Sequence, residues 1–119
     1  KVENSAIINN SQFGGCEIYI DTNFKITGSC YINGSYRIIQ TDYAAEKDKV
    51  YTATLNFDNK VLSFYVNKQL IGTYSSSYDV ATPANNTIWV IGQNANGLTA
   101  DGTDKLSGNI YSVFMHGEV

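Results

Sequence analysis

The sequence predicts an all-β protein, an antiparallel β-sandwich formed by two sheets. Apolar and polar residues alternate over short stretches, and clusters of Gly, Asn, Asp and Ser separate these stretches. No segment carries an apolar stripe of helical period, and Tyr43–Lys49, with its helical composition, is expected to be a loop with one helical turn. With 119 residues, 43% of them hydrophobic, the chain is long enough for one core and too short for two.

The expected strands follow one another along the whole chain and are bounded by turn-forming residues. They are Ala6–Asn9, Cys16–Ile20, Phe24–Thr27, Cys30–Ile32, Tyr36–Gln40, Val50–Phe57, Val61–Asn67, Gln69–Tyr74, Ile88–Ile91 and Leu106–His116.

The stretch from Thr52 to Tyr74 predicts a three-stranded antiparallel meander. A two-residue loop at Asp58–Asn59 gives one apolar and one polar face, and a slip of one residue would mix them. A second loop at Asn67–Lys68 would bring Ile71 opposite Phe64, although a three-residue loop also fits the pattern. The expected pairs are Leu55 with Leu62, Ala53 with Phe64, Tyr51 with Val66, Asn56 with Val61, Thr54 with Ser63, Thr52 with Tyr65, and Leu70 beside Tyr65.

The two cysteines lie on neighbouring expected strands. A hairpin that turns at Asp21–Asn23 places Cys16 opposite Gly28, with Cys30 diagonally across. Diagonal Cα separations of about 7–8 Å exceed disulfide geometry. A disulfide therefore requires a two-residue shift of register or a bulge, and the alternative is a pair of small buried thiols. The sequence leaves both open.

Charge and hydropathy exclude two classes of partner. The net charge is -3 and the few lysines are scattered, so the basic patch of a nucleic-acid-binding protein is missing. No apolar run approaches the roughly 20 residues that span a bilayer. We therefore expect neither nucleic-acid binding nor membrane insertion.

Several motifs follow one another in a characteristic order. They include "NFDN", "FYVNK", "VIGQNANG" and "LSGNIYSVFMH", after "IINNSQFGGCEIYID" and "FKITGSCYINGSYRIIQ". This order resembles the laminin-G-like, or concanavalin-A-like, jelly-roll modules of bacterial surface and secreted proteins and of phage tail proteins. The resemblance implies one such domain over residues 1–119. Because family members usually carry further strands before the "IINN" position, we expect this chain to be a fragment that lacks N-terminal strands.

The acidic residues do not match the catalytic pattern of the β-glucanases that share this fold. Those enzymes use E-x-D-x-E, whereas "CEIYID" has Glu17, Tyr19 and Asp21. Glu17 and Asp21 would lie about 13 Å apart along a strand, and a retaining mechanism needs about 5–5.5 Å. We expect Glu17 to face solvent and Asp21 to open a turn. His116 is the only histidine and is expected at the surface, so no enzyme is expected and a glycoside hydrolase is the least favoured alternative.

Carbohydrate recognition uses aromatic faces for sugar C–H groups and planar polar groups for hydroxyls. The candidates are Tyr36 and Arg37 after the "NGS" turn, together with Thr52, Ser63 and Tyr65 on the polar face of the meander. Trp89 alternates with Ile91, and the corresponding family positions are apolar and inward. We therefore expect Trp89 in the core rather than in a sugar site.

A calcium ion is a further expectation from the resemblance, because members of the family often hold Ca²⁺ at a rim loop. The loop Gly92–Lys105 is rich in oxygen-bearing side chains, which Ca²⁺ prefers. The candidate ligands are Asn94, Asn96, Asp101 and Asp104.

The expected function is that of a non-catalytic recognition module that binds carbohydrate or a cell-surface partner. Such a module would belong to a larger extracellular, cell-surface or virion protein. The alternative is a structural module that spaces or assembles its neighbours, with an unpaired sheet edge that accepts a strand from the rest of the chain.

Overall fold

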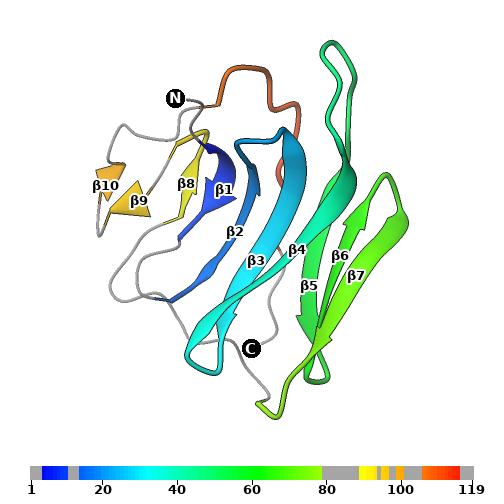
Figure 1. The fold of residues 1–119 in the computed structure, drawn as a ribbon. Helices are drawn as coiled ribbons and strands as arrows, with labels where there is room; N and C mark the ends of the chain where they lie inside the picture. The colour runs from blue at the N-terminus through cyan, green and yellow to red at the C-terminus, as the bar shows by residue number, and fades with distance from the viewer. Residues whose placement is uncertain are drawn as a thin grey trace.

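In the computed structural model the chain forms two antiparallel sheets that pack face to face (Figure 1). The structure describes residues 4–10, 14–78, 89–93, 95–96, 99–100 and 106–115. The larger sheet has the order β4-β3-β2-β1-β8, the smaller has the order β5-β6-β7, and β9 pairs with β10. The strands are β1 Ser5–Asn9, β2 Cys16–Ile20, β3 Lys25–Ile32, β4 Ser35–Ala44, β5 Ala53–Asp58, β6 Val61–Val66, β7 Gln69–Ser75, β8 Val90–Ile91, β9 Ala95–Asn96 and β10 Thr99–Ala100.

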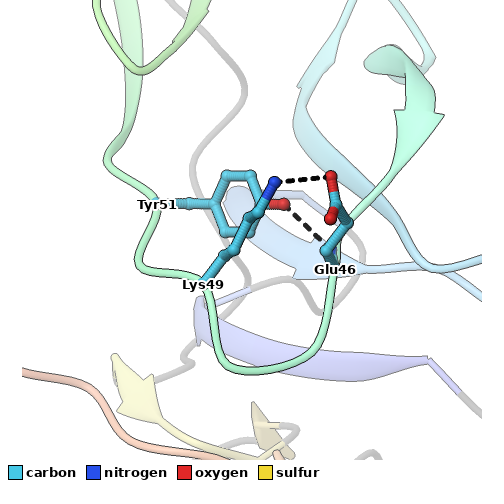
Figure 2. Close-up of polar contacts among 3 residues, drawn as sticks. All are labelled: Glu46, Lys49 and Tyr51. Carbon is cyan, nitrogen blue, oxygen red and sulfur yellow. Dashed lines mark hydrogen bonds and ion pairs between the residues drawn. The ribbon is translucent and has the colours of Figure 1, made fainter.

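None of the described residues is helical, and none of these ranges contains a helix able to cross a membrane. The loop expected at Tyr43–Lys49 is present from residue 45, after β4 ends at Ala44, but it contains no helical turn. The Lys49 N–H donates to the Glu46 carbonyl at 3.4 Å across a turn at Lys47–Asp48. Figure 2 shows what holds this connection. The backbone N–H of Glu46 donates a 2.8 Å hydrogen bond to the Tyr51 hydroxyl, and the Glu46 carboxylate pairs with Lys49 at 2.8 Å. Because this ion pair is exposed, it adds little stability.

The first hairpin of the meander has the predicted faces and a different register. Asn59 and Lys60 form its turn, with φ of 52° and 67°, the conformation that favours tight hairpins. Leu55 therefore lies opposite Phe64 and not opposite Leu62. The predicted pairing is wrong by two residues, which keeps every side chain on its predicted face because the alternation has a period of two. The observed register pairs Phe57 with Leu62, and Phe57 packs against the core group that contains Leu62.

The second hairpin turns at Asn67–Lys68 and pairs Leu70 with Tyr65, as predicted. The expected pair of Ile71 with Phe64 is wrong, because a β-bulge places Gly72 opposite Phe64. The extra residue changes the alternation, so both Ile71 and Tyr74 pack toward the core.

Strand β3 is continuous through Gly28 and Ser29, where two separate strands were expected. Gly28 faces the smaller sheet, and a Cβ at this position would lie 2.5 Å from Cδ1 of Phe64 and 2.9 Å from Cδ1 of Leu55. The glycine therefore makes room for the Phe64 ring and is not a strand break.

The core lies between β3 and β6 and is divided into two groups of buried side chains. One comprises Ile26, Phe64 and Val66, and the other comprises Cys30, Ile32 and Leu62. Cys16 lies directly opposite Cys30, with 4.1 Å between their Cα atoms, and the two form a disulfide. The two-residue shift of register required for a bridge is thus the arrangement found, and both cysteines are bonded.

The smaller sheet covers only part of the larger one. Its strands pack on β3 and β4, with Ile18 of β2 at the margin. Ile91 pairs with Ile8 and therefore shares the inner face of the larger sheet, and Trp89, two residues earlier, has the same orientation. Trp89 and Ile91 are nevertheless 45% and 53% exposed. The expected core position of Trp89 is wrong because the smaller sheet does not extend over β8.

The expected C-terminal strand is also absent from the described residues. Residues 106–115 form no ladder, and in Figure 1 this orange segment runs along the upper end of the larger sheet. The backbone N–H of Leu106 donates to the carbonyl of Gly92 at 2.8 Å. A strand needs a neighbouring edge, and this segment follows no edge of either sheet.

Candidate functional site

The outer face of the smaller sheet carries a continuous set of uncharged polar side chains. Three rows cross its three strands. Two of them are uncharged, Thr54–Tyr65–Leu70 and Asn56–Ser63–Thr73, and the third, Asp58–Val61–Ser75, carries one carboxylate. We call the six residues of the two uncharged rows the polar platform. Hydroxyl and amide groups surround one tyrosine on it, and the only purely apolar member is Leu70, at its margin.

The position of β6 in the middle of the sheet explains the exposure of the platform residues. Tyr65 and Ser63 are half-buried between two neighbouring strands, whereas Thr54, Asn56 and Thr73 on the outer strands are exposed. The backbone ladders on both sides fix the spacing of these side chains. The platform is therefore rigid at its centre and hydrated at its edges.

Thr52 lies at one end of the platform, one residue before β5. Its backbone N–H donates to Oδ1 of Asn67 at 3.0 Å, and its carbonyl accepts from the Asn67 N–H at 2.8 Å. The structure thus brings together three of the residues that the sequence predicts for carbohydrate contact, Thr52, Ser63 and Tyr65. Thr73 was not predicted, because the bulge in β7 changes the alternation that would have revealed it.

Tyr36 lies away from the platform, on the outer face of the larger sheet. Its hydroxyl donates to the carbonyl of Gly14 at 3.1 Å and accepts from the Gly14 N–H at 3.4 Å. Its ring packs edge-on against Tyr31, with 4.9 Å between the centroids. These contacts tie the chain before β2 to the β3–β4 hairpin, so the Tyr36 hydroxyl serves the fold.

Arg37 points to the opposite face of β4. Its Nε donates to the carbonyl of Ile32 at 3.0 Å and its Nη2 to the carbonyl of Asn33 at 3.1 Å, while the guanidinium lies 4.8 Å from the centroid of the Tyr74 ring. The side chain closes one end of the core by a cation–π contact. Tyr36 and Arg37 therefore do not form one site with each other or with the platform.

Comparison with known families identifies this type of sandwich. A laminin-G-like family model, described as the concanavalin A-like lectin/glucanases superfamily, matches residues 1–117. The chain belongs to this superfamily. No match was found among curated proteins or among solved structures. Membership agrees with the two antiparallel sheets and fits a binding module in general.

Two acidic residues of this concanavalin A-like module, Glu17 and Asp21, lie in β2 and in the turn after it. Oδ1 of Asp21 accepts hydrogen bonds from the backbone N–H groups of Asn23, at 2.9 Å, and Lys25, at 2.8 Å. This carboxylate therefore stabilises the β2–β3 turn, as expected from its position. Glu17 lies opposite Ser29 on the outer face of the larger sheet.

Tyr19 lies between these two acids on the same face of β2. Burial raises the pKa of Tyr19 to about 12, and the charges of Glu17 and Asp21 add to the shift. Because an unfolded tyrosine ionises near pH 10, the folded protein keeps a proton between about pH 10 and 12 that the unfolded chain has lost. The stabilising contribution is complete below about pH 10 and falls as the pH rises toward 12.

Replacing Tyr19 with phenylalanine is therefore expected to reduce the loss of stability in alkali. Urea unfolding midpoints measured from about pH 9 to pH 12 should fall more steeply for the wild type than for Tyr19→Phe. Tyr78→Phe removes an exposed phenol and serves as the control. Parallel curves for all three proteins would contradict the assignment.

Four buried polar side chains were not anticipated from the sequence: Asn9, Thr27, Ser29 and Thr41. The hydrogen bonds of Thr41 explain why its hydroxyl is buried. Its hydroxyl accepts from the backbone N–H of Ile26 at 3.2 Å and donates to the carbonyl of Tyr43 at 2.6 Å, at the point where the β3–β4 register is interrupted. It thus satisfies backbone groups that the irregular ladder leaves unpaired.

Three of the four expected calcium ligands, Asn94, Asp101 and Asp104, lie outside the described residues, whereas Asn96 belongs to β9. His116, which was expected at the surface, also lies outside them. Within the described ranges, no group of three His, Cys, Asp or Glu side chains is placed to hold a metal ion.

Proposed function

We propose that this concanavalin A-like module is non-catalytic and binds carbohydrate on the polar platform. The observation that carries the proposal is the platform itself: hydroxyl and amide groups arranged around Tyr65 on a rigid sheet face without charge in its two rows. In this proposal the module recognises a glycan on behalf of a larger extracellular, cell-surface or virion protein.

The chemistry of the platform matches that of a neutral sugar. A tyrosine ring offers an apolar surface to sugar C–H groups and keeps a polar hydroxyl at its tip. Ser63, Thr54 and Thr73 can each donate and accept hydrogen bonds, and the amide of Asn56 presents both functions in one plane. Because the backbone ladders already fix the strands, little conformational entropy would be lost on binding.

A non-catalytic role is supported by the hydrogen bonds of Asp21 and by the presence of Tyr19 at the position of the central acid. Asp21 is engaged by two backbone N–H groups of its own turn, so it is not presented to a substrate as a nucleophile. Tyr19 occupies the place of the central acid, and a phenol is neutral at pH 7 even at its ordinary pKa near 10. Hydrolysis of a β-glucan by the wild type but not by Glu17→Gln would overturn this part of the proposal.

The proposal includes a structural calcium ion at the rim of the sandwich. Its ligands would come from the segment that contains Asn94, Asn96, Asp101 and Asp104, and the ion would take no part in a reaction. A glycan array probed once with Ca²⁺ and once with chelator tests it. Binding that disappears with chelator supports a calcium-dependent rim, and binding that is unchanged removes the ion from the proposal.

Replacing Tyr65 with alanine is expected to weaken binding of the glycan selected on the array at least tenfold, or about 1.4 kcal/mol. The loss follows from removing the aromatic surface at the centre of the platform. Titration calorimetry with wild type, Tyr65→Ala and the matched control Tyr43→Ala measures it, since Tyr43 is an exposed tyrosine on β4 of the larger sheet.

Two results would contradict the assignment. If Tyr43→Ala weakens binding as much as Tyr65→Ala, the platform is not the site. If a broad array shows no binding with or without Ca²⁺, carbohydrate recognition is wrong for this module.

A further inference from the structure

Three hairpins of the molecule turn on two residues with positive φ, and in each the first of the two is an exposed asparagine. These turns are Asn33–Gly34 between β3 and β4, Asn59–Lys60 between β5 and β6, and Asn67–Lys68 between β6 and β7. The asparagine has a φ of 52° in the first two turns and 51° in the third. The chain therefore presents one backbone conformation in two chemical contexts, with glycine after one asparagine and lysine after the other two.

Asn33 combines the features that favour cyclisation of an asparagine. This reaction joins the side-chain Cγ to the backbone nitrogen of the next residue, so it is fastest where that residue has no side chain to obstruct the approach. A Cβ at Gly34 would meet no atom within 4 Å, so neighbouring elements do not obstruct it either. Among the described residues no hydrogen bond holds the Asn33 side-chain amide, whereas Oδ1 of Asn67 accepts from the Thr52 N–H at 3.0 Å.

Two side chains hold this turn in its observed conformation. Nη2 of Arg37 donates to the carbonyl of Asn33 at 3.1 Å, and the Tyr31 hydroxyl donates to the carbonyl of Gly34 at 2.9 Å. The Asn33 carbonyl and the Gly34 nitrogen belong to one planar peptide group, so the bond from Arg37 also fixes the direction of that nitrogen. Arg37 is anchored in turn by its contact with the Tyr74 ring. Rotation of this peptide group toward Cγ of Asn33 therefore requires that Arg37 release it.

We propose that Asn33 is a site of spontaneous deamidation and that Arg37 controls its rate. The backbone nitrogen of Gly34 loses its proton to solvent base and attacks Cγ of Asn33. A new N–C bond closes a cyclic imide, the Cγ–Nδ2 bond breaks, and the amide nitrogen leaves as ammonia after taking up a proton. Water then opens the imide at either carbonyl, which gives aspartate or, where the main chain now passes through the side chain, isoaspartate.

The modification changes the charge and the geometry of the β3–β4 hairpin. Either product adds one negative charge to a protein whose net charge is -3, and isoaspartate also lengthens the main chain of the turn by one methylene. Because loop length sets the register of a hairpin, isoaspartate should disturb the pairing of Ile32 with Ser35. This hairpin belongs to the larger sheet, so the inference is independent of carbohydrate binding on the polar platform.

Peptide mapping by mass spectrometry, after incubation of the folded protein at mildly alkaline pH, measures the conversion at each turn. Asn33 is expected to convert at least about tenfold faster than Asn59, which has the same φ and is also exposed but precedes Lys60. Gly34→Lys is the matched variant, because the other two turns accommodate lysine at this position, and it should lower the rate at Asn33 to that at Asn59. Equal rates at Asn33 and Asn59 in the wild type, or an unchanged rate at Asn33 in Gly34→Lys, would overturn the assignment.

Arg37→Ala tests the control exerted by the guanidinium. Loss of this charged hydrogen bond should raise the rate at Asn33 about tenfold relative to the rate at Asn59. In urea, where both proteins are unfolded, wild type and Arg37→Ala should convert Asn33 at the same rate. Tyr31→Phe removes only the hydroxyl contact and should give a smaller rise in the folded protein. If Asn33 and Asn59 accelerate together in Arg37→Ala, or if the rate at Asn33 is unchanged, the role of Arg37 is wrong.

Discussion

Replacing Phe64 with alanine is expected to lower the free energy of unfolding by about 3–5 kcal/mol, as for other fully buried aromatic residues. Phe64 has no exposed surface and lies at the centre of one core group with Ile26 and Val66. The cost should lie toward the upper end, because the ring fills the space that Gly28 leaves on the facing strand and no side chain there can move into the cavity.

Chemical denaturation monitored by fluorescence measures this effect. Phe24→Ala is the control, since Phe24 is exposed at the β2–β3 turn, and it should change stability by less than about 1 kcal/mol. Similar losses for the two variants would contradict the placement of the core between β3 and β6.

Removing the disulfide is expected to cost about 3 kcal/mol, the value for a closed loop of about 15 residues. Cys16 and Cys30 are separated by 14 positions in the sequence, and their bridge joins β2 to β3 directly. The double variant Cys16→Ala/Cys30→Ala should show this loss with or without reductant. Alanine is preferred to serine because Cys30 is buried in the core and a hydroxyl there would need a partner.

Comparing reduced and oxidised wild type with the double variant separates the effect of the disulfide from the effect of replacing the two cysteines. Wild type unfolded in the presence of reductant should approach the double variant, whereas oxidised wild type should remain more stable. If reductant has no effect on wild-type stability while mass spectrometry shows free thiols, the bridge does not contribute as described.

The sequence predicted the faces of the strands better than their registers. Alternation assigns Leu55 and Phe64 to one face and Ser63 and Tyr65 to the other, and the structure confirms this. A shift of two residues preserves the alternation, so the pattern alone could not fix which residues pair. The same limit applied to Cys16 and Cys30, where the pairing depends on the turn between them.

Three errors arose from tertiary context that a single sequence does not reveal. Gly28 and Ser29 are turn-forming residues and so predict a strand boundary, yet Gly28 lies within β3 and faces the Phe64 ring. Trp89 has the predicted orientation, but nothing in the smaller sheet covers it. The C-terminal segment has the composition of a strand, and whether it becomes one depends on an available edge.

The candidate site was predicted in part. Thr52, Ser63 and Tyr65 follow from the polar side of the meander, and the structure places them together. Tyr36 and Arg37 are adjacent in β4, and adjacent residues of a strand point to opposite faces, so the sequence already contained the reason that they cannot form one site. Thr73 depends on the bulge in β7, which no pattern in the sequence indicated.

The most direct test of carbohydrate recognition is an NMR titration of the isotope-labelled protein with the glycan selected on the array. Binding on the polar platform predicts concentration-dependent shifts at the amides of Thr54, Ser63, Tyr65 and Thr73, with little change along β1 to β4. Shifts confined to the larger sheet or to the loop after Gly92, with the platform unchanged, would contradict the proposed site.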